Sequence, residues 1–243
     1  RRVLFRSSKT YLEKTRLRIK IMEEFVKTLL LTGKMAVITT AVLFVFSLPI
    51  AYWLAYSKFK GKVIFEALVC MPMVLPPTVL GYYFLLLISP TRGFGKFLNE
   101  TFDIQLAFTF EGIVIASIIA NLPFMIQPLQ NGFSALPKSF KEAAYTLGKS
   151  RWTTFWRVLL PNIKPSIITG LALTFAHCIG EFGIVLMIGG SIPHETKVAS
   201  IELYDQVQAL NYDLANQYAL ILFAISFILL MIIFSINKKK TLF

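Results

Sequence analysis

The sequence predicts an all-α polytopic membrane protein with about five transmembrane helices. Apolar residues make up 56% of the chain, and the mean hydropathy is +0.65. Charged residues make up only 16%, below the roughly 25% of soluble domains. The apolar residues form five segments, each near the about 20 residues that a helix needs to cross a bilayer. One soluble core cannot bury this much apolar surface, so the bilayer is the expected solvent.

The first 21 residues form a basic arm. They hold eight basic residues and one acid, which supplies +7 of the formal net charge of +12. Because the chain starts at Arg1 and Met22 opens a more natural beginning, residues 1–21 are expected to be a non-native or disordered basic extension. The alternative is a genuine basic arm at the membrane surface. The membrane domain is then expected to span residues 22–240.

The predicted crossings are residues 35–56, 63–89, 110–129, 167–188 and 218–236. Prolines interrupt the second and third of them: Pro72, Pro76 and Pro77, then Pro123 and Pro128. Proline removes a backbone donor and clashes with the preceding turn, so kinks are expected there. Such kinks fit a substrate path as well as they fit simple packing.

The charges of the connections predict the orientation. Residues 57–62 carry three lysines, and residues 131–164 carry six basic residues against Glu142 alone. The tail has three lysines, whereas residues 191–216 have four acids against Lys197. By the positive-inside rule the basic connections and the C-terminus are cytoplasmic, and the acidic loop faces outside. Five crossings then put the N-terminus outside, which the basic extension contradicts.

The longest polar connection contains a charged, helix-forming block. Residues 138–150 are expected to form a short amphipathic helix, which Ser139 caps with Glu142 as its reciprocal partner. Gly148 then lets the chain turn. A membrane protein has little reason to carry such a block unless a cytoplasmic partner binds it.

The spacing within this block resembles the coupling motif of bacterial ABC importer permeases. Three residues separate Glu-Ala-Ala from the glycine, and a Leu-Pro pair precedes the fourth apolar segment. The resemblance implies a type I importer permease with its coupling region at residues 138–161. The motif helix would fit a cleft on separate ATPase subunits and pass their ATP-driven closure to the membrane helices. The implied coupling residues are Glu142, Ala143, Ala144, Gly148, Leu160 and Pro161.

Glu181 lies inside the fourth predicted crossing, where an acid is costly and marks a functional site by default. His177 lies four residues earlier on the same helix face, and Thr174 shares that stripe. A His177–Glu181 pair would lower the cost of burying the acid, and a purely structural pair is the equal alternative. Hydroxyls and amides inside the spans could pass a charged substrate without trapping it. The predicted path or gate residues are Thr78, Asn121, Thr174, His177 and Glu181.

The GEFG run at residues 180–183 and the loop GGSIPHETK at residues 189–197 resemble the molybdate importer permeases, whose relatives carry sulfate and tungstate. The runs KFKGK, at residues 58–62, and MPMVLPPTVLGYY, at residues 71–83, favour the molybdate branch. The family commonly has Arg where this chain has His177. Arginine is always charged, whereas histidine need not be near pH 7, so a fixed positive charge on the path is in doubt.

The predicted function is therefore a membrane permease subunit of an ATP-driven importer that forms the path for molybdate. The alternatives are a permease for sulfate, tungstate or another oxyanion, and, in a different class, a channel or secondary transporter. The expected partners are ATP-binding cassette subunits, an external molybdate-binding protein, a second copy of the chain and the lipid bilayer, but no nucleic acid. The expected location is the bacterial inner membrane.

No enzyme activity, cofactor or metal is expected. Neither Walker motif is present, so a separate chain would hydrolyse ATP. Cys70 and Cys178 lie singly in apolar segments, without the spacing of a metal or redox site. His177 and Cys178 diverge as neighbours on a helix and lack further ligands.

Overall fold

The computed structural model describes residues 2–238, with side chains from residue 21 to residue 235. Within this range every regular element is helical, which confirms the all-α class. The predicted extension, residues 1–21, lies almost wholly outside the described side chains, and its nature stays a prediction. The elements are α1 (Arg2–Tyr56), α2 (Lys62–Val74), α3 (Pro77–Ile88), α4 (Gly93–Phe102), α5 (Phe110–Ser134), α6 (Lys138–Thr146), α7 (Arg151–Thr154), the π-helical turn η1 (Phe155–Leu159), α8 (Leu160–Asn162), α9 (Lys164–Gly180), α10 (Gly183–Gly189), α11 (Ala199–Gln208) and α12 (Tyr212–Lys238).

Three described helices are long and apolar enough to cross a bilayer: Ile21–Tyr56, Phe110–Ser134 and Tyr212–Ser235. Two bent pairs raise the number to five if each pair makes one crossing. The first pair is α2 with α3, bent by 112°, and the second is Arg151–Asn162 with α9, bent by 72°. The prediction of about five crossings agrees with this upper number.

The second and fourth predicted crossings each divide into two helices. The interruption of the second was predicted from its prolines, whereas that of the fourth was not. The segment 63–89 breaks between α2 and α3, because a residue before proline is pushed out of the helical region. Leu75 and Pro76 accordingly have extended ψ angles of 140° and 132°. The segment 167–188 breaks at Glu181, whose ψ is 126°, and resumes as α10. The interruption predicted at Pro123 and Pro128 is wrong, because α5 continues through both prolines.

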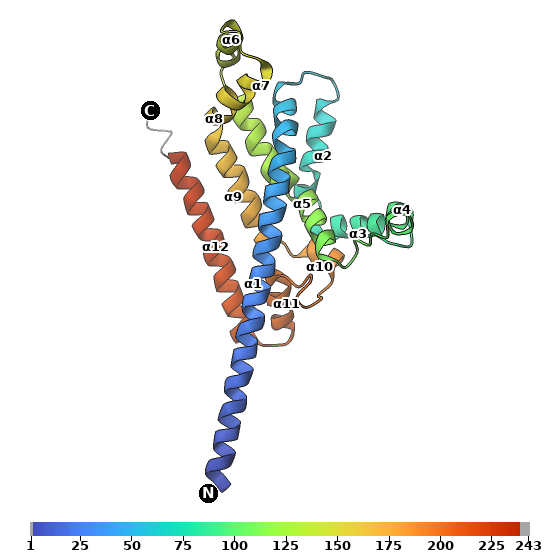
Figure 1. The fold of residues 1–243 in the computed structure, drawn as a ribbon, viewed down its shortest axis with the longest axis vertical. Coiled ribbons are helices and arrows are strands. Elements are labelled where there is room, and N and C mark those ends of the chain that lie inside the picture. The colour runs from blue at the N-terminus through green and yellow to red at the C-terminus, as the bar shows by residue number, and fades with distance from the viewer. Residues whose placement is uncertain (1, 239–243) are drawn as a thin grey trace.

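The centre of the molecule is a bundle in which α5 packs against both α1 and α9 (Figure 1). One buried cluster, around Leu54, Met125 and Phe133, fills the half of the bundle nearer α6. A second, around Ile113, Ile184 and Val198, fills the half that holds α10 and α11. Small residues allow the helices to approach closely, as is usual in membrane bundles. A Cβ on Gly170 of α9, for example, would lie 3.2 Å from the sulfur of Met125 on α5.

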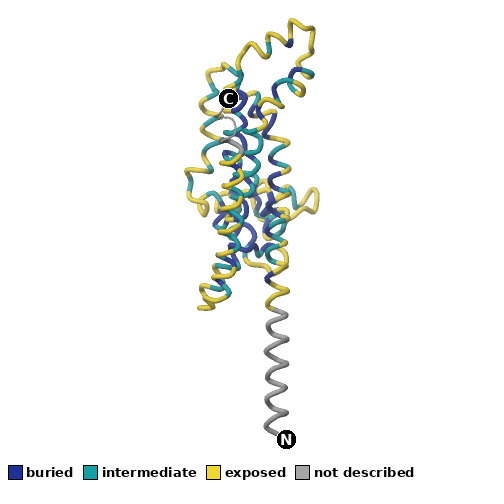
Figure 2. Tube along the Cα trace, turned by 90° about the vertical axis from the view of Figure 1, so that its left-hand side faces the viewer, coloured by how far each residue is buried: buried dark blue, intermediate teal, exposed yellow. Residues whose placement is uncertain are grey.

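The two ends of the bundle differ. Figure 1 shows α6 at one end, with the end of α12 directed toward that same end, and α11 near the other. Figure 2 shows the buried residues along the bundle and a mostly exposed segment around α6. The α3–α4 arm projects sideways (Figure 1). Neither α4 nor α11 was expected as a helix, because both lie in segments that read as polar connections.

Candidate functional site

The predicted coupling block stands out from the bundle on α6. Glu142 and Ala143 are exposed, whereas Ala144 is only 5% exposed and packs inward. Leu147, just after the helix, is 75% exposed. The capping prediction for Ser139 is wrong. The helix begins at Lys138 after Pro137, without a side-chain cap, so Ser139 lies within the first turn.

The turn predicted at Gly148 is confirmed. Its φ of +69° lies in the left-handed region that glycine adopts without strain. The Lys149 amide donates to the Ala144 carbonyl at 3.0 Å, which closes the end of α6. The helix ends at Thr146, four residues before the predicted end.

The chain then returns toward the membrane helices. Ser150 caps α7, because its hydroxyl accepts the Thr153 amide at 3.1 Å. The π-helical turn η1 follows, and such turns are frequent at functional sites. Leu159 is buried, Leu160 half-buried and Pro161 exposed, so the Leu-Pro pair lies where the block joins α9. A shallow pocket on this face is lined by Gly148, Lys149, Ser150, Trp152, Thr153, Trp156 and Arg157.

Three of the predicted path residues meet in a polar cluster, here called the Glu181 node. Asn121 of α5 donates from Nδ2 to Glu181 Oε2 at 2.9 Å. His177 Nδ1 lies 3.1 Å from Asn121 Oδ1, which can only accept, and 3.5 Å from Glu181 Oε2. The His177 ring stacks on Phe124, with 4.1 Å between ring centroids. The node joins α5 to the end of α9.

The node coincides with the break between α9 and α10. Glu181 is the residue at which α9 ends, and its side chain is 3% exposed, whereas the His177 side chain is 40% exposed. The Glu181 carbonyl accepts the Ser200 hydroxyl of α11 at 2.5 Å. The junction is therefore held by α5, α9 and α11 together, with His177 at its accessible edge.

The other two predicted path residues are not joined to the node by a hydrogen bond in the described part of the chain. Thr174 lies on α9, one turn before His177, and its buried hydroxyl has no partner among the described residues. Thr78 is exposed on α3. Its backbone lies near α10, because a Cβ on Gly183 would stand 3.4 Å from the Thr78 amide nitrogen.

A polar seam between α2 and α5 was not predicted. Gln130 Nε2 donates to Glu66 Oε1 at 2.6 Å, and Gln127 Nε2 lies 2.9 Å from Cys70 Sγ. Lys62 also contacts Glu66, at 3.5 Å. The rule that drew attention to Glu181, an acid within an apolar segment, applies equally to Glu66 and would have found it.

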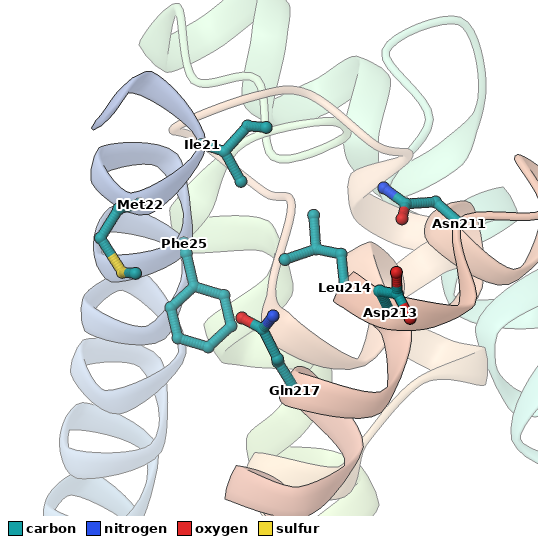
Figure 3. A pocket seen from close by; sticks show the side chains of 7 residues that line it. All are labelled: Ile21, Met22, Phe25, Asn211, Asp213, Leu214 and Gln217. Atoms are coloured by element: carbon teal, nitrogen blue, oxygen red, sulfur yellow. The ribbon is translucent and has the colours of Figure 1, made fainter. Parts of the chain in front are cut away.

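A pocket near the opposite end contains none of the predicted site residues (Figure 3). It lies between α1 and the start of α12, with Phe25 on one side and Leu214 and Gln217 on the other. Among the residues that the structure describes, no group of three or more His, Cys, Asp or Glu side chains could hold a metal ion.

Comparison with known proteins shows the family to which the chain belongs. Residues 47–238 match the family described as "Binding-protein-dependent transport system inner membrane component". The chain is 41% identical to the molybdenum transport system permease protein ModB of Azotobacter vinelandii, over 86% of this chain and 93% of that one. It is 35% identical to the sulfate transport system permease protein CysT of Escherichia coli, over 82% and 70% of the two chains.

Among solved structures, a chain of a bacterial alginate ABC transporter in complex with its periplasmic protein shares the fold. The TM-score is 0.70 at 18% identity, over 89% of this chain and 78% of that one. The family match covers most of the sequence, including the coupling block and the Glu181 node. The chain therefore belongs to the inner membrane components of binding-protein-dependent transport systems, and is a multi-pass permease subunit of an ABC importer rather than an enzyme.

Proposed function

We propose that this permease forms the translocation path for molybdate, which an external binding protein delivers. The observation that carries the proposal is the 41% identity to a molybdenum permease over nearly the whole of both chains. Sulfate is the second candidate, because a sulfate permease is 35% identical over a similar part of this chain. Both substrates are tetrahedral dianions, so the same side chains could line the path for either one.

The ATPase docks on the exposed side of α6. Glu142, Ala143 and Leu147 face away from the bundle, and the exposed Trp152 extends this surface beyond Gly148. An exposed apolar patch with a single acid suits insertion into a cleft on a partner protein. The coupling residues of this proposal are Glu142, Ala143, Ala144, Gly148, Leu160 and Pro161.

The path runs beside the Glu181 node. The sequence of α5 contains no Lys or Arg, and α9 has only Lys164 at its start. A dianion would therefore meet amides and hydroxyls rather than a fixed cation that traps it. Asn121, His177 and Glu181 lie where the helices change direction, so they act as a gate or orient the helices around it. Thr78 and Thr174 add hydroxyls to the same region.

Two copies of the chain enclose the path. None of the residues of α2 is buried within one copy, and Val63 and Val74 are 72% and 83% exposed. Up to five crossings enclose a channel poorly, whereas a second copy would cover such a face and supply a second α6 for a second ATPase subunit. The described end of α12 points toward the end that holds α6 (Figure 1), which supports a cytoplasmic C-terminus if α6 is the cytoplasmic docking helix.

The test is substrate-stimulated ATP hydrolysis in liposomes that hold the permease, its ATPase and its binding protein. Molybdate, tungstate and sulfate are compared over a concentration series. Stimulation by molybdate at the lowest concentration, lost in Glu142→Lys, is the expected result. Stimulation by sulfate alone would replace molybdate with the second candidate. Failure of the permease to bind any ATPase would overturn the assignment of the coupling face.

A further inference from the structure

Lys141 reaches from α6 to the last turn of α1. Its Nζ lies 2.9 Å from the centroid of the Tyr56 ring and 4.7 Å from that of Tyr52. The two tyrosines are four residues apart, so both rings face the same side of α1. An ammonium group over an aromatic face is attracted by the electrons of the ring, and more strongly when water is partly excluded.

The rings that receive Lys141 are themselves held in place. The Tyr56 hydroxyl donates to the Phe133 carbonyl at the end of α5, at 3.0 Å. Tyr52 meets Phe133 and Phe155 edge to face, with centroids 5.5 Å and 5.3 Å away. Phe133 and Phe155 stack on each other at 5.9 Å. The acceptor of the cation is therefore a cluster shared by α1, α5 and η1.

Apart from Lys141, α6 makes few contacts with α1. Its nearest elements along the backbone are α7 and η1. Ala144 is the only buried residue of α6 and lies three positions after Lys141, on the same face. The exposed Glu142 and Ala143 take up the partner-facing side. Lys141 thus occupies the side of α6 that faces the bundle, opposite the docking surface.

We propose that Lys141 is a positioning residue that latches α6 to α1 through Tyr52 and Tyr56. The inference rests on the proposed coupling function and adds a second route for it. Displacement of α6 by an ATPase then moves α1 directly, as well as α9 through η1. Without the latch, α6 would tilt on its α7 connection and part of the displacement would be lost.

The ionisation of Lys141 gives the latch a testable pH dependence. Burial lowers the pKa of Lys141 to about 8, so the ammonium form predominates at pH 7 and the neutral form at pH 9. Among the described residues, Tyr145 of α6 also acts electrostatically on both rings, and Arg151 of α7 acts on that of Tyr52. A latch that depends on the cation weakens over this range in the wild type. It persists in Lys141→Arg, because arginine stays charged.

The first measurement needs no transport. Hydrogen exchange of the α6 amides is followed by mass spectrometry in the purified permease. Lys141→Met and Tyr56→Leu are expected to speed exchange about 5-fold. Lys141→Arg is expected to exchange at the wild-type rate, because the cation is kept. Lys138→Met, which changes an exposed lysine of the same helix, should also leave the exchange rate unchanged. Unchanged exchange in both Lys141→Met and Tyr56→Leu would overturn the latch.

The second measurement is the ratio of substrate transported to ATP hydrolysed in the reconstituted importer. Lys141→Met should still bind the ATPase but lower this ratio about 5-fold. Between pH 7 and pH 9 the ratio should fall in the wild type more than in Lys141→Arg. Faster exchange with an unchanged ratio would overturn the transmission role. A wild-type importer without stimulated hydrolysis would count against the proposed function, while hydrogen exchange would still decide the latch.

Discussion

Truncation of Asn121 is expected to loosen the junction between α5 and the α9–α10 break. Its amide donates to Glu181 Oε2 at 2.9 Å, and its Oδ1 lies 3.1 Å from His177 Nδ1. Its third bond, to the Ser117 carbonyl at 2.8 Å, stays within α5. Asn121→Ala therefore removes two bonds between helices and leaves Glu181, which is 5% exposed, without its amide donor.

The size of the effect depends on the charge of the acceptor. Hydrogen bonds between membrane helices average about 0.6 kcal/mol, so two ordinary ones give about 1.2 kcal/mol. Bonds to charged groups contribute about 1.5–3 kcal/mol, and a buried carboxylate that loses its donor also keeps its desolvation cost. We therefore expect Asn121→Ala to lower the free energy of unfolding by about 2 kcal/mol, about 30-fold in the folding equilibrium.

The assay is unfolding by sodium dodecyl sulfate in mixed micelles. A double-mutant cycle with Glu181→Gln isolates the Asn121–Glu181 pair, and its coupling energy should be about 1 kcal/mol or more. Ser117→Ala is the matched control one turn earlier on α5, where the hydroxyl makes only a 3.8 Å contact with the Met35 sulfur. It should change stability by less than about 0.5 kcal/mol. If the stability effects of Asn121→Ala and Glu181→Gln add within about 0.3 kcal/mol in the double mutant, the role assigned to the pair is refuted.

Three further substitutions test other parts of the structure. Gly148→Ala should cost about 1–2 kcal/mol because φ is +69°. ATPase affinity should then fall about 5-fold or more, and unchanged affinity would contradict the rigid turn. Lys197→Met removes the contacts of Lys197 Nζ with two acids of α11, at 2.8 Å from Glu202 and 2.9 Å from Asp205. It should lower the unfolding temperature, and less so in high salt. Glu66→Leu breaks the 2.6 Å bond from Gln130 and should cost less than about 1.7 kcal/mol by the same detergent unfolding. A larger loss would mean that Glu66 contributes more than the bond that it accepts from Gln130.

The helices could be predicted from composition, but their breaks could not all be. Consecutive Pro76 and Pro77 force the preceding residues into extended backbone, and the helix stops. Single prolines at Pro123 and Pro128 remove one bond each, and packing of α5 against its neighbouring helices keeps it continuous. The break at Glu181 has no proline. It depends on contacts with α5 and α11, which a local pattern does not contain.

The same distinction holds for the site. The approach of His177 to Glu181 follows from four-residue spacing and could be predicted, as could the turn at Gly148. The partnership of Asn121 with Glu181 joins residues 60 positions apart and depends on how α5 meets α9. The contact of Lys141 with Tyr56 depends on the direction in which α6 leaves the bundle. Spacing motifs predicted the coupling surface, while its attachment to the bundle required the tertiary structure.

The coupling block and the Glu181 node lie at opposite ends of one helix. The η1 turn follows α7 and leads through α8 into α9, with a bend of 72° between the segments. At 1.5 Å per residue, the 17 residues of α9 span about 25 Å and end at Glu181. A force on α6 would therefore pass through α7, η1 and α8 into α9, which ends at the α9–α10 break, while the latch would carry the same force into α1. Because α1 and α9 both pack against α5, opposite movements of the two helices would act on Asn121 and its bond to Glu181. Under the proposed function, breaking this bond is how movement of the coupling helix would open the path, so Asn121→Ala should raise basal ATP hydrolysis without substrate as well as lower stability. An unchanged basal rate of ATP hydrolysis in a folded Asn121→Ala importer would mean that the Glu181 node does not act as the gate.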